Sequence, residues 1–386
     1  MIESRFIEKL LKNREIEFKS LGDVTEMKRG KTITAKDASG GDIPVISGGQ
    51  KPAYYHNEYN RNGKTITVAG SGAYAGFIMY WEEPIFVSDA FSIKSDETLL
   101  DLKYVYHFLL QHQQKIYGMK KGSGVPHVYP KDLSTLVIPI PPLDVQQEIV
   151  RILDAFTSLT AELTAELTSR QKQYQYFRDK LLNFDDISDR GGYETNPITK
   201  ALWHNKKVVF KALGNISENL DFMRKPITSG LREKGNIPYY GASGIVDYVK
   251  DYIFEGDYLL VSEDGANLLA RNTPIAFSIS GKNWVNNHAH VLKFNTYTER
   301  RFVEFYLNNI DLTPYISGAS QPKLNKNNLS NIKIPAPPFE EQQRIVTILD
   351  KFETLTNSIA EGLPKEIELR RKQYEYYREK LLSFSQ

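Results

Sequence analysis

The 386-residue chain contains no cysteine, which excludes disulfide bonds and thiolate metal sites. It also lacks any run close to 18 apolar residues, and residues 1–18 mix charged with apolar side chains instead of forming the apolar segment of a signal peptide. From these absences we expect a soluble, cytoplasmic protein without membrane contact. An excess of one charge is lacking too, since the net charge is only +2. A uniformly basic surface for nucleic acid is therefore excluded, and any such binding must use local basic loops or a partner.

Nucleotide and cofactor motifs are incomplete wherever the chain approaches them. Gly30 to Thr32 and Gly63 to Thr65 resemble the end of a phosphate-binding loop, but the glycine required five residues earlier is absent from both. Gly70 to Gly76 resembles a dinucleotide loop, yet Phe77 to Trp81 after it reads as a strand, not as the helix that would hold a pyrophosphate. Asn196 to Thr199 lacks the second proline and the aromatic residue of an amino-methyltransferase motif.

The histidines do not suggest catalysis or a metal site. His288 and His290 are two apart in an expected strand, so they should face the same way, and no carboxylate or third histidine accompanies them in the sequence. A structural pair is the better interpretation, and no Ser–His–Asp arrangement stands above chance. We therefore predict that the chain has no active site and binds no metal.

What the sequence does contain is a duplication. Arg170 to Phe184 and Arg370 to Phe384 are identical at 10 of 15 positions, and Gly122 to Leu143 matches Gly318 to Phe339 without a gap. The heptapeptide that begins at Phe18, FKSLGDV, returns at residue 210 as FKALGNI. The chain is thus two copies of a unit of just under 200 residues, a period too long for a solenoid, and we expect an internal pseudo-two-fold.

Each copy is expected to be a β-rich region with one short helix, followed by prolines and a long helix. In the first copy the strands are Lys64–Gly70, Phe77–Trp81 and Pro84–Lys94, and the short helix is Leu102–Tyr117. In the second copy the strands are 257–262, 274–280 and 288–294, and the helix is 300–310. Prolines 139, 141 and 142, and again 335, 337 and 338, predict a hinge before the long helix.

A heptad pattern follows each proline cluster and predicts a coiled-coil seam, in which Thr160 and Arg170 fill two further positions. In the second copy the pattern resumes four residues late, so we predict a stutter near residues 362–366, with a kink or helix restart at Pro364. The apolar and aromatic seam residues are Ile149, Leu153, Phe156, Leu163, Leu167, Tyr174, Phe177, Leu181, Ile345, Leu349, Phe352, Ile359, Leu363, Tyr374, Tyr377 and Leu381.

The expected fold class is α+β. A helix of about 40 residues spans roughly 60 Å, too long to be buried in its own domain, so an antiparallel pair of the two helices with a globular domain at each end is the economical architecture. The alternative is that each helix dimerises independently. The expected boundaries are 1–143 for the first domain, 144–184 for its helix, 185–205 for a linker, 206–339 for the second domain and 340–386 for its helix.

Loops at equivalent places in both copies gather basic, amide and aromatic residues, the types that contact phosphates and base edges. Ordinary solvated loops are the alternative interpretation. The candidates for DNA binding are Arg29, Lys31, Lys36, Tyr54, Tyr55, Ser71, Tyr74, Lys120, Lys121, Ser123, His127, Arg224, Lys225, Arg232, Lys234, Tyr239, Tyr240, Asn267, Arg271, Asn286, Asn287, His288, Gln321, Lys323 and Asn325.

A globular domain, a proline cluster, a Q-Q-x-I-V-x-I-L-D helix start and an R-x-K-Q-Y-x-Y-x-R-x-K-L-L helix end occur twice, with the helix starts at Gln146 to Asp154 and Gln342 to Asp350. This arrangement resembles the specificity subunit of a type I restriction–modification system over essentially the whole chain. The resemblance implies two target recognition domains, each reading one half of a bipartite DNA site, and an antiparallel helical spacer that fixes the distance between the halves.

By the same resemblance, two modification subunits dock on the spacer and carry S-adenosylmethionine, and restriction subunits that use ATP and Mg²⁺ join them. Double-stranded DNA is the target, and this chain itself binds no cofactor. Since the loops differ between copies, as Gly70 to Gly76 differs from Ser262 to Leu269, the target should not be palindromic. The rival hypotheses are a fused methyltransferase, which would need the missing cofactor motifs, and a coiled-coil scaffold that does not read DNA.

Overall fold

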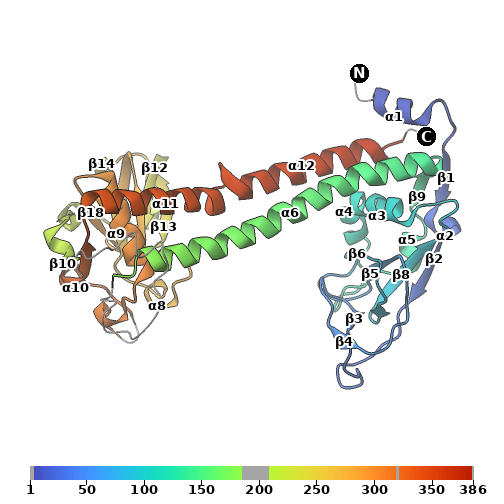
Figure 1. The fold of residues 1–386 in the computed structure, drawn as a ribbon, viewed down its shortest axis with the longest axis horizontal. Helices are drawn as coiled ribbons and strands as arrows, with labels where there is room; N and C mark the ends of the chain where they lie inside the picture. Colours follow the sequence, from blue (N-terminus) through green and yellow to red (C-terminus); the bar gives the residue numbers. More distant parts are fainter. Residues whose placement is uncertain (1–3, 185–207, 319–320, 385–386) are drawn as a thin grey trace. The chain divides into compact units, whose positions relative to one another are not determined.

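The computed structural model describes residues 4–184, 208–318 and 321–384 (Figure 1). The chain forms two compact units. Unit one comprises Met1–Ala165 with Lys365–Gln386, and unit two comprises Glu166–Pro364. Each unit therefore combines one globular domain with parts of both long helical segments. The predicted linker at 185–205, with the Asn196 to Thr199 motif, lies outside the described residues.

The first domain is built on a four-stranded antiparallel sheet in the order β2-β8-β5-β6 (Figure 1). Its strands are β2 Thr25–Arg29, β5 Thr65–Ala69, β6 Ile78–Trp81 and β8 Ala90–Ser95. A smaller sheet has the order β4-β3-β7, from β3 Ile43–Ile46, β4 Tyr54–His56 and β7 Phe86–Val87. The helices are α1 Ser4–Leu11, α2 Leu21–Val24, α3 Leu102–Gln111, α4 Gln113–Tyr117 and α5 Pro130–Leu133.

A central strand of the main sheet, β5, is covered on both faces. All five residues of β5 are buried, which is unusual for a strand with one solvated face and typical of one covered on both. Helix α3 packs against β5 and β6, and its Tyr104 is fully buried, with its hydroxyl donating to the carbonyl of Pro139 at 3.0 Å.

Two predicted elements of this domain are each divided. The predicted strand Pro84–Lys94 is in fact two strands, β7 and β8, in different sheets. The predicted helix Leu102–Tyr117 is interrupted at His112.

The second domain repeats this plan. Its main sheet has the order β11-β18-β15-β16, from β11 Glu218–Asn219, β15 Tyr258–Ser262, β16 Ala276–Ile279 and β18 Ala289–Lys293. The other sheet is β13-β12-β17-β14, from β12 Lys234–Gly241, β13 Gly244–Val249, β14 Phe254–Glu255 and β17 Lys282–Val285. The α-helices are α8 Asn267–Ala270, α9 Tyr297–Asn309 and α10 Lys326–Asn331, and short 3-10 turns lie at Leu213–Asn215, Asp221–Met223, Ser229–Leu231 and Thr313–Tyr315.

The proline clusters do not form a free hinge. Pro139 lies in β9 Val137–Ile140, which pairs with β1 Glu17–Ser20 and places Phe18 opposite Pro139. The second copy repeats the ribbon with β10 Val209–Ala212 and β19 Lys333–Ala336. A proline is tolerated there because a two-stranded ribbon leaves one edge of each strand unpaired. The segment predicted as a hinge is thus held by strand pairing as far as Ile140, and only Pro141 and Pro142 separate the strand from the long helix.

The heptad of the first copy is confirmed by helix α6, Leu143–Leu181, which passes from unit one into unit two. Every predicted seam position of α6 is buried or half-buried, while most side chains between them are exposed. In unit one Phe156 stacks on Tyr377, with ring centroids 5.2 Å apart. In unit two Phe177 stacks on Phe352 at 5.6 Å.

The helices pair in antiparallel fashion within each unit. In unit one the early α6 residues Ile149 and Leu153 share a core with Leu381, near the C-terminal end of α12 Gly362–Leu382. In unit two the last residue of α6, Leu181, shares a core with Ile345 and other residues of α11 Phe339–Asn357.

The second long helix is not continuous, which corrects the prediction of a stutter. It ends at Asn357 and restarts at Gly362, so four residues leave the helix, the same number by which the second copy is longer. Gly362 has φ +78, a conformation that favours glycine, and a helix restart close to Pro364 is confirmed. The seam prediction for Ile359 is wrong: this side chain lies in the break and is 81% exposed. Ile367 is buried instead.

The repeated Q-Q-x-I-V-x-I-L-D motif attaches each helix to its own domain. Gln146 is fully buried: its Oε1 accepts from the backbone N–H of Asp101 at 2.9 Å, and its Nε2 donates to the carbonyls of Leu99 and Pro141 at 3.1 and 2.8 Å. In the second copy Gln342 donates to the carbonyl of Pro337 at 2.9 Å.

The aspartate that closes the motif makes a second attachment. Asp154 lies 3.0 Å from His107 and 2.9 Å from Lys103, both on α3. Burial raises the pKa of Asp154, but its hydrogen bonds to His107 and Lys103 lower it by more. The pKa of Asp154 therefore lies below its ordinary value. Asp350 does the same in unit two, where it is 2.8 Å from Arg301 on α9.

Candidate nucleic-acid interface

In the first domain three segments meet beyond one end of the main sheet. The backbone N–H of Gly70, after β5, donates to the carbonyl of Asp89, before β8, at 3.2 Å. Val128, in the turn before α5, donates to the carbonyl of Gly70 at 3.0 Å. We call this meeting point the loop junction of the domain.

The second domain has the same junction. Glu263, after β15, donates to the carbonyl of His288, before β18, at 2.9 Å, and Leu324 donates to the carbonyl of Glu263 at 2.8 Å. The turns match as well. The backbones of Lys121 and His127 form an isolated antiparallel β-bridge in the first domain, and those of Ser317 and Lys323 form one in the second. The backbones of the two junctions are therefore equivalent, and their side chains decide what each can bind.

The junction of the first domain is hollow. A cavity of about 170 Å³ is lined by residues of all three segments, among them Arg29, Asp89, His127 and Tyr129. The exposed guanidinium of Arg29 lies over the ring of Tyr129, 5.5 Å from its centroid, and His127 stacks beside the same ring at 6.0 Å. Ser71 hydrogen-bonds to the carboxylate of Asp89.

The other candidates of the first domain differ in availability. Five of them have exposed side chains and can reach a ligand: Lys31, Lys36, Tyr55, Tyr74 and Ser123.

Three further candidates are partly engaged within the protein. Tyr54 donates its hydroxyl to the carbonyl of Ile33 at 2.5 Å. Lys120 donates to the carbonyl of Ala73 at 3.0 Å, and Lys121 pairs with Asp132 at 2.6 Å. Contacts with DNA by these residues stay predictions.

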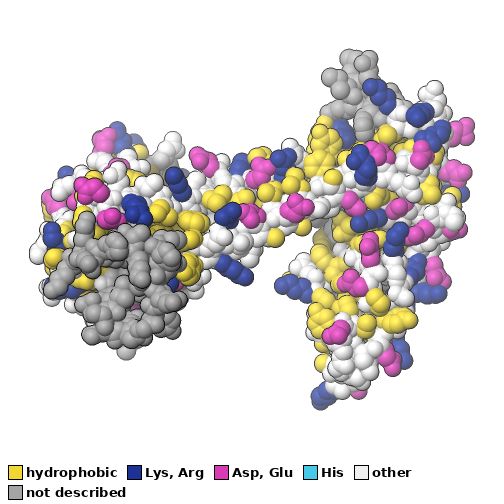
Figure 2. All heavy atoms as spheres, in the orientation of Figure 1, with side chains coloured by type: hydrophobic (Ala, Val, Ile, Leu, Met, Phe, Trp, Pro, Cys, Tyr) yellow, Lys and Arg dark blue, Asp and Glu magenta, His cyan; other side chains and the backbone are white. Residues whose placement is uncertain are grey.

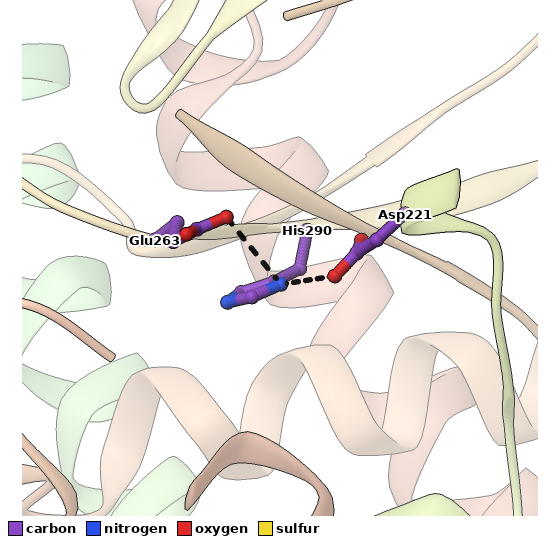
Figure 3. A group of neighbouring side chains, drawn as sticks. All are labelled: Asp221, Glu263 and His290. Atoms are coloured by element: carbon purple, nitrogen blue, oxygen red, sulfur yellow. Dashed lines mark hydrogen bonds and ion pairs between the residues drawn. The ribbon is translucent and has the colours of Figure 1, made fainter. Parts of the chain in front are cut away.

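The junction of the second domain is filled by an ion network (Figure 3). Nδ1 of His290 lies 2.6 Å from Asp221 and 3.8 Å from Glu263. Arg224 is 2.6 Å from Glu263 and 3.4 Å from Asp221, and Lys323 is 3.1 Å from Glu263. We call these five residues the junction network. The prediction that no carboxylate accompanies the histidines is therefore wrong, because the acids come from distant segments.

The network holds its acids in the ionised form. Burial raises the pKa of Asp221, but the hydrogen bond and the charge of His290 lower it by more. The pKa of Asp221 therefore lies below its ordinary value. Burial likewise raises the pKa of Glu263, and the hydrogen bonds from Arg224 and Lys323 more than reverse this.

Asp221, Glu263 and His290 lie close enough together to suggest a metal site, since their ligand atoms are within 4.8 Å of one another. Both carboxylates, however, already face Arg224 or Lys323. Nε2 of His290 lies 2.7 Å from the carbonyl of Leu324, and Nδ1 lies near Asp221, so both ring nitrogens are engaged with protein oxygens. Since the carboxylates and the ring nitrogens already have partners within the protein, the arrangement is that of an internal ion network.

His288 and His290 do not face the same way, contrary to the sequence-based expectation. His290 is buried, whereas the side chain of His288 is half exposed and lies 2.9 Å from Asp264. His288 precedes β18 and is outside the strand alternation, which explains the difference.

Several candidates of the second domain support the fold itself. Tyr239 was expected in a surface loop but is a buried residue of β12, and its hydroxyl accepts from the N–H of Ile227 at 2.9 Å. Arg271 donates to the carbonyl of Ile310 at the end of α9 at 2.7 Å. Asn325 caps α10.

Further internal contacts involve the remaining candidates. Arg232 lies over the ring of Tyr239 at 4.4 Å and pairs with Asp247 at 3.0 Å. Half-buried Tyr240 packs near Phe277. Buried Asn286 accepts from the N–H of His288, and Asn267 bonds to the backbone of Thr273. Lys225, Lys234, Asn287 and Gln321 are exposed.

Sequence reasoning missed several residues of this region. Asp89 and Tyr129 line the cavity of the first domain, but neither stood in a basic cluster. Phe222 and Leu231, each close in sequence to a candidate arginine of the second domain, are 78% and 77% exposed, whereas hydrophobic patterning would assign both to a core.

Charge is spread over the molecule. On the face drawn in Figure 2, basic and acidic side chains are interspersed, in keeping with the net charge of +2. None of the helices in the described part of the chain has the length and apolar character needed to cross a bilayer.

Comparison with known proteins identifies the repeat. The family model for the type I restriction modification DNA specificity domain matches residues 13–170 and again residues 205–369. The type I restriction enzyme EcoR124I/EcoR124II specificity subunit of Escherichia coli is 32% identical over 100% of this chain and 98% of its own length. The EcoprrI specificity subunit of Escherichia coli is 29% identical over 94% of this chain and 93% of its own.

Among solved structures, the S subunit of a type I restriction-modification system from M. genitalium superposes with a TM-score of 0.66 at 20% identity, covering 97% of this chain and 98% of that one. This likeness shows a shared fold. Since the family model matches most of the chain in two separate copies, the chain belongs to the family of type I restriction–modification DNA specificity proteins.

Proposed function

We propose that this chain is the DNA-specificity subunit of a type I restriction–modification complex, in which each domain reads one half of a bipartite, asymmetric target. One observation carries the proposal: the two loop junctions have equivalent backbones and different side chains. Two domains with one backbone plan and different side chains present different donors and acceptors to base edges, at the junctions or on the loops around them, so they read two sequences.

The chain is proposed to contribute recognition and not chemistry. Adenine methylation with S-adenosylmethionine would be supplied by modification subunits, and ATP-driven translocation and cleavage by restriction subunits, all in the cytoplasm. The near-neutral charge supports a shared DNA interface, because a chain with net charge +2 offers few phosphate contacts of its own.

The helices offer two matching surfaces for two copies of one partner. Tyr176 on α6 and Tyr376 on α12 are exposed and lie outside the seam, each with a lysine four residues later near its ring, at 5.9 and 5.7 Å. Aromatic residues are enriched at protein interfaces. We propose that one modification subunit docks on each.

Duplex binding by the purified chain, alone and mixed with its modification subunits, tests this function. We expect sequence-dependent binding, and methylation of one adenine pattern, only in the mixture. The paired change Tyr176→Ala and Tyr376→Ala should weaken assembly, while Tyr55→Ala, a control at a somewhat more exposed tyrosine, should not. A mixture that assembles but binds all duplexes equally would favour the rival hypothesis of a scaffold that does not read DNA.

A further inference from the structure

The strand pairing shows which residues of the two junctions correspond. In the first domain Val68 of β5 lies opposite Phe91 of β8, and in the second Val261 of β15 lies opposite His290 of β18. Phe91 and His290 therefore occupy the same place. Gly70 and Glu263 come two residues after Val68 and Val261, directly after the central strands, so they also correspond.

The neighbouring edge strand extends the match. Arg29 of β2 lies opposite Phe91 in the first domain. In the second domain Leu220 donates to the carbonyl of Val291, so the next residue, Asp221, reaches the position opposite His290. Arg29 and Asp221 are thus equivalent positions with opposite charge.

At these matched places the charged side chains of the second domain are paired with one another, whereas Arg29 of the first domain is not paired with an acid within the described residues. In the second domain the acids, His290, Arg224 and Lys323 satisfy one another, and the side chains of Arg224 and Glu263 are only 13% and 11% exposed. In the first domain a cavity remains, and within the described residues the guanidinium of Arg29 makes no hydrogen bond and rests on Tyr129.

We propose that Arg29 reads a guanine in the half-site of the first domain, and that the matched place in the second domain is a structural network that reads no base. This inference rests on the proposed function. It implies that the two domains, although they share one fold, read DNA with residues at different places.

The chemistry favours a guanine edge over a phosphate. Arginine presents two parallel N–H donors that match O6 and N7 of guanine, and stacking on the ring of Tyr129 limits the orientations of the guanidinium. A phosphate would bring negative charge to a cavity that Asp89 also lines. The Asp89 carboxylate instead suits a base pair, because it can accept from the amino group of cytosine.

The test uses the assembled complex with its modification subunits. Methylated adenines would be mapped for wild type, Arg29→Ala, Arg29→Lys and Lys323→Ala. We expect Arg29→Ala to make one guanine position of the first half-site degenerate and to leave the second half-site intact. Arg29→Lys should retain part of the preference. Lys323→Ala should leave both half-sites unchanged, although Lys323 is half exposed at the matched junction.

A chemical probe separates base from phosphate. Replacing that guanine by 7-deazaguanine should weaken wild-type binding about tenfold and leave Arg29→Ala binding unchanged. Uniform weakening of all duplexes by Arg29→Ala, with an unaltered methylation pattern, would show a phosphate contact and overturn the inference. So would an unaltered pattern with full affinity, or a base preference lost in Lys323→Ala. If the wild-type complex itself methylates no bipartite sequence, the proposed function fails first.

Discussion

At the scale of single residues, position in the fold decides what a polar side chain does. The adjacent glutamines of the helix-start motif are alike in sequence, yet Gln146 is fully buried and Gln147 is exposed. Similarly, Arg29 is exposed over a cavity, while Arg224 is held by two acids. Residue type predicted that both arginines can donate hydrogen bonds to DNA. It did not predict that, of the two, only Arg29 has a guanidinium without an acidic partner among the described residues.

The junction network should contribute to the stability of the second domain. Glu263→Gln removes the acid that pairs with both Arg224 and Lys323, and breaking a buried ion pair from one side costs about 3 kcal/mol. We expect thermal unfolding of the full chain to show unit two destabilised by that amount. Glu233→Gln is the matched control, since Glu233 pairs with Lys250 at 3.0 Å on the surface, and this change should leave the stability almost unchanged. Equal effects would mean that burial does not matter here.

The buried glutamine gives a second prediction. Gln146→Ala leaves the N–H of Asp101 and two carbonyls without their partner, which should cost about 2–4 kcal/mol. Gln147→Ala should be nearly neutral. Urea unfolding of the two variants measures the difference, and a neutral Gln146→Ala would show that the helix start is held by packing alone.

At the scale of elements, sequence patterns were strongest where period and repetition agreed. The heptad predicted every seam position of α6, because one long regular helix keeps one face toward its neighbour. The same reasoning failed at Ile359, since four extra residues can either shift a helix or leave it, and the pattern does not distinguish these. The junction network was invisible because Asp221, Glu263 and His290 are brought together only by strand pairing.

The break in the second helix sharpens a test of the spacer. Four residues inserted into α6 after Glu166 add about 6 Å of helix and nearly preserve the apolar face. We expect the unread spacer between half-sites to lengthen by one or two base pairs, at about 3.4 Å each, while both half-sites are unchanged. Four residues inserted after Ile359, in the break, are the control and should not alter the spacing. An unchanged spacing in the α6 variant, with full activity, would mean that the helices do not set the distance.

At the scale of the whole molecule, the duplication explains most of the architecture. Two copies of one unit give two sheets of the same strand order, two proline-containing ribbons and two helix attachments. The fold was therefore predictable from repetition. Differences between the junctions were not, because duplication preserves the backbone while side chains diverge at the loops, and the partner base of a side chain depends on its placement.

The central claim is that the two domains read two half-sites independently. The most direct measurement replaces residues 1–140 with the corresponding domain of another family member, assembles the chain with its modification subunits, and maps methylated adenines by sequencing. The account predicts a new first half-site, an unchanged second half-site and an unchanged spacer. A change in both half-sites, or in neither, would contradict it.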